Sequence, residues 1–132
     1  MCAGRDGNTG AMIGTLRSIV LDCQDPRALA AFYAEVLGGE VTAEDDTWQV
    51  VTDPSGRRVA CQYSPQHEAP EFPDPRGSQQ IHLDIQVEDP DVAQRQVLAL
   101  GATRVPDAVE DSDFRVFRDP AGHPFCLVWG IG

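Results

Sequence analysis

The chain has 132 residues, of which ten are basic and twenty-one acidic, for a formal net charge of −11. That length fits a single domain with its own hydrophobic core. The acidic balance excludes the basic surface that nucleic acids and anionic membranes require, and no apolar run reaches the roughly 18 residues of a membrane-spanning helix.

The first twelve residues, MCAGRDGNTGAM, are rich in small and polar residues and contain no basic cluster followed by an apolar segment. This pattern does not fit a secretory signal. We therefore predict a flexible arm at 1–12 and one domain at 13–132.

The cysteines are widely spaced and form no CxxC pair or zinc-ribbon pattern. They are Cys2, Cys23, Cys61 and Cys126. Three of them lie in strand-like runs, where a free cysteine behaves as a small buried hydrophobic residue. We expect reduced thiols and a cytoplasmic location.

The first half of the chain predicts a strand, a helix and further strands. Residues 15–24 alternate between apolar and polar, and residues 25–41 have apolar side chains at helical spacing. Asp25 is suited to cap the helix, Pro26 to its first position, and Gly38 to its end. A short strand near 40–43 and a strand, turn and strand at 48–63 follow, with DPSG as the turn.

The second half repeats this order. A strand at 81–88 precedes a helical segment at 89–105 that again begins with Asp-Pro, and a short strand is expected near 104–105. Residues 114–129 then form a strand, a DPAG turn and a strand. The two Asp-Pro helix starts are 64 residues apart, and the two turns are 66 residues apart.

The repeat predicts an α+β fold of two βαβββ modules, at about 14–63 and 79–130, joined by a Pro-rich linker at 64–78. Neither module is large enough to bury its own sheet face. We expect the modules to form a curled mixed sheet with helices outside and an open concave cleft inside.

The stretch QQIHLDIQVEDPD at 79–91 places a polar face toward that cleft. Apolar residues alternate with Gln80, His82, Asp84 and Gln86. A solvent-exposed strand face rarely carries an imidazole, a carboxylate and two amides in one row. The pattern favours the wall of a binding cleft.

Three stretches together resemble the vicinal oxygen chelate superfamily, which includes glyoxalase I, extradiol dioxygenases and bleomycin-resistance proteins. They are DPRALAAFY from Asp25, HLDIQVED from His82 and FRDPAGHPFCLV from Phe117. With LGAT from Leu100, the combination is most similar to uncharacterised glyoxalase-like proteins common in actinobacteria. The resemblance covers about 14–130 and implies the fold described above.

In metal-using members, the resemblance implies two His or Gln and one or two Glu ligands around an open divalent site. The matching positions here are Ser18, Ala60, His82 and Cys126. Only His82 is a usual ligand, and alanine cannot coordinate a metal. Gln62 and Asp84 share the inward face, but each lies two residues from a ligand position. We therefore expect no metal cofactor of the usual kind.

Two interpretations of the inward residues stay open. His82 is either a binding or acid–base residue or a structural histidine hydrogen-bonded to Asp84. Cys126 is expected close to His82, either as part of an activated thiolate pair or as an inert buried cysteine. Trp48 either forms the floor of an apolar pocket or packs in the hydrophobic core.

The sequence thus predicts metal-independent binding of a small organic molecule in the cleft, as in the drug-sequestering members of the superfamily. The expected ligand-binding residues are Ser18, Trp48, Gln62, His82, Asp84 and Cys126. By resemblance, a homodimer is expected. The alternative is a lyase, isomerase or dioxygenase-type enzyme that uses His82 as acid–base or metal ligand.

Overall fold

The computed structural model describes residues 12–73, 79–106, 108, 110 and 113–130. Residues 1–11 of the arm predicted at 1–12, including Cys2, lie outside this set. Among the described residues, no helix has the length and apolar character needed to cross a membrane.

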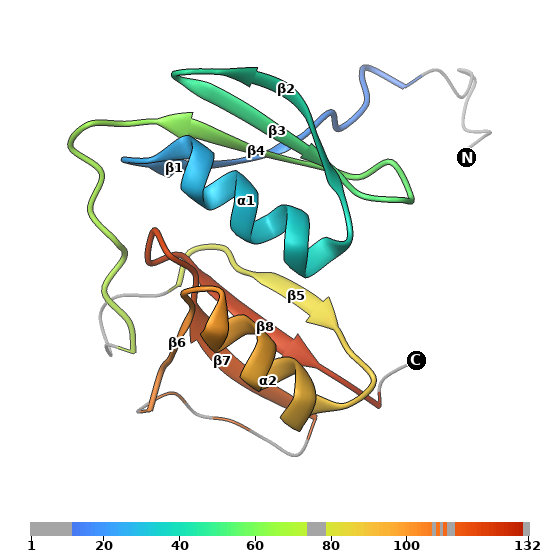
Figure 1. The fold of residues 1–132 in the computed structure, drawn as a ribbon, viewed down its shortest axis with the longest axis vertical. Coiled ribbons are helices and arrows are strands. Elements are labelled where there is room, and N and C mark those ends of the chain that lie inside the picture. Colours follow the sequence, from blue (N-terminus) through green and yellow to red (C-terminus); the bar gives the residue numbers. More distant parts are fainter. Residues whose placement is uncertain (1–11, 74–78, 107, 109, 111–112, 131–132) are drawn as a thin grey trace.

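The first module follows the predicted order (Figure 1). Its elements are β1 (Ile19–Cys23), α1 (Pro26–Leu37), β2 (Glu40–Asp45), β3 (Trp48–Thr52) and β4 (Arg58–Tyr63). The strands form one sheet in the order β1-β4-β3-β2, with β1 parallel to β4 and the other pairs antiparallel.

The second module repeats this arrangement. Its elements are β5 (Leu83–Gln86), α2 (Pro90–Ala99), β6 (Thr103–Arg104), β7 (Phe114–Arg118) and β8 (Pro124–Val128). The sheet order β5-β8-β7-β6 is the same as in the first module, again with one parallel pair. The predicted α+β fold of two βαβββ modules is confirmed, with the eight strands divided between two four-stranded sheets.

The helix starts are formed as the sequence indicates. The Asp25 carboxylate accepts a hydrogen bond from the Ala28 backbone N–H at 3.1 Å. Asp89 does the same for two N–H groups in the first turn of α2. Gly38, at the end of α1, has φ 63°, a left-handed conformation that favours glycine.

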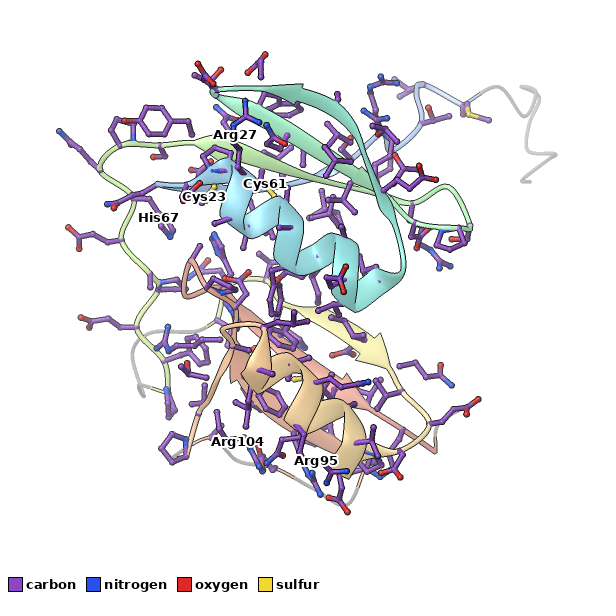
Figure 2. All side chains as sticks on the ribbon, in the orientation of Figure 1. Cys23, Arg27, Cys61, His67, Arg95 and Arg104 are labelled. Atoms are coloured by element: carbon purple, nitrogen blue, oxygen red, sulfur yellow. The ribbon has the colours of Figure 1, made fainter. Side chains whose placement is uncertain are left out.

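A single hydrophobic core joins the modules. In Figure 1, α1 lies between the first sheet and the second module. The ring of Phe32 on α1 contacts that of Phe125 on β8, with centroids 5.8 Å apart. Tyr33 donates a hydrogen bond of 2.6 Å from its hydroxyl to the buried carboxylate of Asp119, in the β7–β8 turn. Cys23 and Cys61 lie in the same core, on the sheet face that α1 covers (Figure 2).

Two features differ from the expectation. The strand predicted at 81–88 is shorter in the structure, Leu83–Gln86, and Gln80 has φ 67°, so the extended alternation does not reach Gln80. The linker also contributes to the hydrophobic packing of the second module. Its Phe72 is 7% exposed and packs on β7 and β8 in a second, smaller apolar cluster.

Candidate functional site

Three of the predicted site residues, His82, Asp84 and Cys126, come together beside the edge strand β5. Asp84 lies opposite Cys126 in the parallel β5–β8 register. Leu83 and Ile85 point into the helix-covered core, so the alternating side chains face the other way. His82 Nε2 is 3.1 Å from an Asp84 carboxylate oxygen. One ligand-type atom of each of the three residues lies within 4.8 Å of the others.

The electrostatics of this cluster keep the thiol protonated. Burial first, and then the carboxylates of Asp84 and Glu110, together raise the pKa of Cys126 to about 11. The thiol proton also hydrogen-bonds to Asp84, which favours the neutral form. At neutral pH, Cys126 is therefore a weak nucleophile in the absence of a metal ion.

The predicted residues of the first module lie at opposite ends of β4. Trp48 on β3 lies directly opposite Gln62 on β4, so their side chains share one face. Ser18 accepts a hydrogen bond from Arg58 Nε at 3.2 Å. Ala60 is fully buried, opposite Val20.

A groove of about 520 Å³ lies where the modules meet, and we call it the junction groove. Its walls come from both modules and from the linker: Val20, Asp22, Gln62, His67, Glu68, Pro70, Gln79, Gln80, Ile81, His123 and Pro124. Of the predicted site residues, Gln62 lines it. His82 lies in an adjoining hollow of about 40 Å³ that shares Val20, Ile81, His123 and Pro124 with the groove.

The structure brings His67 and His123 together at this groove, although no role was predicted for either residue. Their ring centroids are 4.9 Å apart. His67 Nε2 is 2.9 Å from the Ala121 carbonyl oxygen, and His123 Nε2 is 2.7 Å from that of Asp22. His67 lies on the linker (Figure 2), and His123 lies in the turn between β7 and β8. No local pattern in the sequence signals such a tertiary pair.

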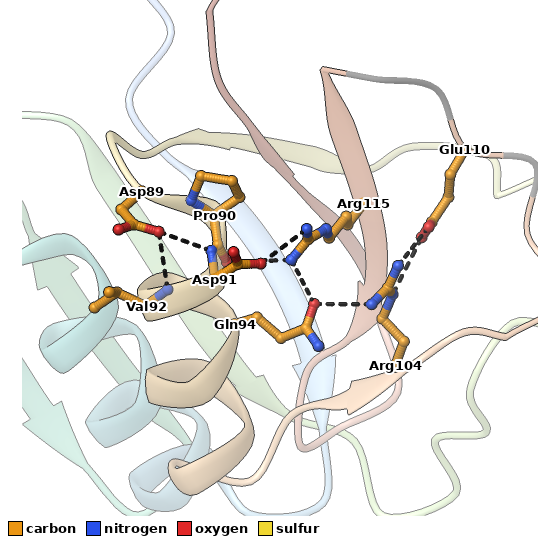
Figure 3. A network of polar contacts seen from close by, with 8 residues as sticks. All are labelled: Asp89, Pro90, Asp91, Val92, Gln94, Arg104, Glu110 and Arg115. Atoms are coloured by element: carbon orange, nitrogen blue, oxygen red, sulfur yellow. Dashed lines mark hydrogen bonds and ion pairs between the residues drawn. The ribbon is translucent and has the colours of Figure 1, made fainter.

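A polar network beyond α2 was also not predicted (Figure 3). Arg104 forms an ion pair with Glu110, whose carboxylate also accepts the Val116 backbone N–H at 2.7 Å. Arg104 and Arg115 both donate to the side-chain oxygen of Gln94. These contacts join β6, β7 and α2, and they use both guanidinium groups structurally.

The residues at the four ligand positions do not fit the metal site that the resemblance implies for metal-using members. Ala60 offers no donor atom. Ser18 is hydrogen-bonded by a guanidinium, whose charge opposes a bound cation. Cys126 is a thiol at a position where the resemblance implies His, Gln or Glu. Only His82 remains as a usual ligand, with Asp84 beside it.

The chain belongs to a family of glyoxalase-like domains, since the family model described as "Glyoxalase-like domain" matches residues 18–128. This agrees with the resemblance to the vicinal oxygen chelate superfamily. No curated protein matches the chain. A special closeness to actinobacterial proteins stays a prediction.

Solved structures of the same superfamily share the fold. A glyoxalase family protein from Enterococcus faecalis is 24% identical, with 88% of this chain and 98% of that chain covered and a TM-score of 0.63. A glyoxalase/bleomycin resistance protein/dioxygenase family enzyme from Burkholderia phytofirmans is 16% identical, with 89% and 100% covered and a TM-score of 0.67. A fosfomycin resistance protein from Listeria monocytogenes is 18% identical, with 91% and 96% covered and a TM-score of 0.67. At these identities the likeness establishes the fold alone.

Proposed function

We propose that this glyoxalase-like protein binds a small organic molecule in the junction groove and needs no metal to do so. The observation that carries the proposal is the groove itself. It has the volume of a small-molecule site and combines apolar walls with a few polar groups, among them the Gln62 amide. Metal independence is supported by two of the ligand positions, because Ala60 has no donor atom and Ser18 is hydrogen-bonded by Arg58.

The first test is elemental analysis of tag-free protein, as purified and after dialysis against manganese, iron, nickel and zinc. We expect well under one equivalent of metal in every sample. A thermal-shift screen of small organic compounds should then find ligands that raise the Tm, because a ligand that binds only the folded state stabilises it.

The matched variants are Gln62→Ala, which removes a polar group of the groove, and Gln66→Ala, which alters an exposed amide of the linker. The thermal shift should fall in the first variant and persist in the second. Equal shifts in both variants would place the ligand elsewhere.

A second candidate function is an enzyme in which His82 acts as acid–base or metal ligand. The proximity of His82, Asp84 and Cys126, within 4.8 Å, favours it. A carboxylate beside an imidazole orients the ring for proton transfer. Near-stoichiometric metal that disappears in His82→Ala would establish this candidate in place of the first and make lyase and dioxygenase assays the next step.

We also propose that the chain forms a homodimer. Val20 and Ile81, both at the junction groove, are 43% and 64% exposed, which favours burial against a second copy. Light scattering coupled to size exclusion should give twice the mass of one chain, and the monomer mass would contradict it.

A further inference from the structure

Residues 67–73 of the linker form a strap across the second module. The strap has no helix or strand, yet its Phe72 is almost fully buried. The ring packs with Val116, Cys126 and Val128. These three side chains lie on the face of β7 and β8 opposite the helix-covered core, because the alternating residues Phe117, Phe125 and Leu127 belong to that core. Phe72 therefore occupies the cleft face of the second sheet.

One side chain, Arg118, holds this part of the strap. Its Nη1 donates to the carbonyl of Pro70 at 2.9 Å, and its Nη2 to that of Phe72 at 2.9 Å. The guanidinium also lies 4.1 Å from the centroid of the Phe72 ring, a cation–π contact. The ring is thus covered by a cation on one side and by apolar side chains on the other.

The strap also passes very close to the β7–β8 turn. A Cβ atom on Gly122 would lie 2.3 Å from the Cβ of Ala69, and Gly122 has φ 89°. Only glycine fits there without displacing the strap. Arg118 Nη1 donates to the Gly122 carbonyl as well, at 2.9 Å, so the same guanidinium positions strap and turn.

The strap lies between the junction groove and the apolar space beside Cys126. His67, Glu68 and Pro70 line the junction groove, and two residues further on Phe72 fills the apolar space beside Cys126. The thiol of Cys126 is in turn within 4.8 Å of His82 and Asp84. If the strap moved aside, the groove and the apolar space would form one continuous cleft.

We propose that the space under Phe72 is a subsite for an aromatic ring, which Phe72 fills as an intramolecular ligand. An aromatic ligand that binds there displaces the strap. The proposal rests on the proposed small-molecule function and specifies its ligand class: a molecule with an aromatic ring for the subsite and a polar part for the groove. The opposing interpretation is that Phe72 serves only as core of the second module.

The experiment uses phenol as the probe and cyclohexanol as its non-aromatic counterpart, with binding followed by amide chemical shifts. Phe72→Ala empties the subsite, and apolar cavities of this kind bind benzene-sized rings. We expect phenol to bind this variant at least tenfold more tightly than the unaltered protein, with shifts centred on Val116 and Val128. Cyclohexanol should bind more weakly, because it lacks the π face that Arg118 contacts.

Arg118→Gln tests displacement without creating a cavity. Loss of the Arg118 hydrogen bonds to the strap should raise the affinity for phenol several-fold and speed amide hydrogen exchange in the strap. Arg104→Gln is the matched control, because Arg104 also lies over an aromatic ring of the second module, that of Phe117, but is bonded to Glu110 and Gln94 instead of the strap. It should leave phenol binding unchanged. If Arg118→Gln does not fold, Arg118→Lys keeps the charge, loses one hydrogen bond and should show the same trend.

Failure to bind phenol in Phe72→Ala, or equal effects of the two Arg→Gln variants, would overturn the aromatic subsite. The proposed function fails separately. A compound from the thermal-shift screen that shifts the amides of Gln62 and His123 but leaves the strap unperturbed would support binding in the groove and contradict displacement of Phe72.

Discussion

At the scale of single residues, the buried thiols dominate the expected pH dependence. Burial is the first cause that raises the pKa of Cys23 to about 11, of Cys61 to about 12 and of Cys126 to about 11. An unfolded chain ionises its thiols near their ordinary value of 9.0. Above that pH, the unfolded state gives up protons that the folded state retains. The stability from these groups is therefore fully present below pH 9 and is lost as the pH rises toward 11–12.

The test compares the free energy of unfolding in urea at pH 7.5 and pH 10, under reducing conditions. We expect the unaltered protein to lose stability over this interval by an amount on the order of 1 kcal/mol per ionising thiol. Cys61→Ala should lose less, since its most strongly shifted thiol is gone. An identical loss in both proteins would mean that other groups, such as Tyr33, control alkaline unfolding.

Residue-level prediction from sequence had a clear limit at the site. The proximity of His82 and Cys126 followed from the resemblance, because both residues occupy positions that the superfamily uses for ligands of one site. The burial of Phe72 and the contact of His67 with His123 did not follow. They depend on the path of a linker without periodicity, and no local rule specifies where such a segment packs.

At the scale of elements, the helix starts were the most predictable feature, because Asp-Pro fixes both the cap and the first backbone torsion. Strand ends were less predictable: the alternating pattern begins at Gln80, three residues before the first residue of β5. Alternation signals which face a side chain takes, but backbone pairing decides where a strand begins, and β5 pairs only over Leu83–Gln86.

The cap of α1 gives a prediction at this scale. Asp25→Ala removes the acceptor for the Ala28 N–H and should lower the free energy of unfolding by about 1 kcal/mol. Asp25→Ser keeps an acceptor at the same position and should retain most of the stability. Urea denaturation monitored by circular dichroism measures both. Equal losses in the two variants would show that the charge of Asp25, rather than its cap, stabilises the helix.

At the scale of the whole molecule, the two modules and their shared core were predictable from the repeat, but the particular contacts between them were not. The hydrogen bond from Tyr33 to Asp119 joins residues 86 positions apart. In the first module, Asp53 at the equivalent turn position accepts only nearby groups. The repeat therefore indicates the turn itself, while the tertiary role of Asp119 depends on its burial under α1.

That hydrogen bond gives the last prediction. Tyr33→Phe keeps the ring in the core but leaves a buried carboxylate oxygen of Asp119 without its donor, so the free energy of unfolding should fall by about 1–3 kcal/mol. Tyr63→Phe is the matched control, because Tyr63 is 43% exposed, and it should have almost no effect.

Trp48 lies in the first module and Trp129 follows the last strand of the second. Fluorescence of the two single-tryptophan variants therefore reports each module separately. Coincident transitions in the Tyr33→Phe background would mean that the core still unfolds as one cooperative unit. Transitions at different urea concentrations would mean that this one hydrogen bond couples the folding of the two modules.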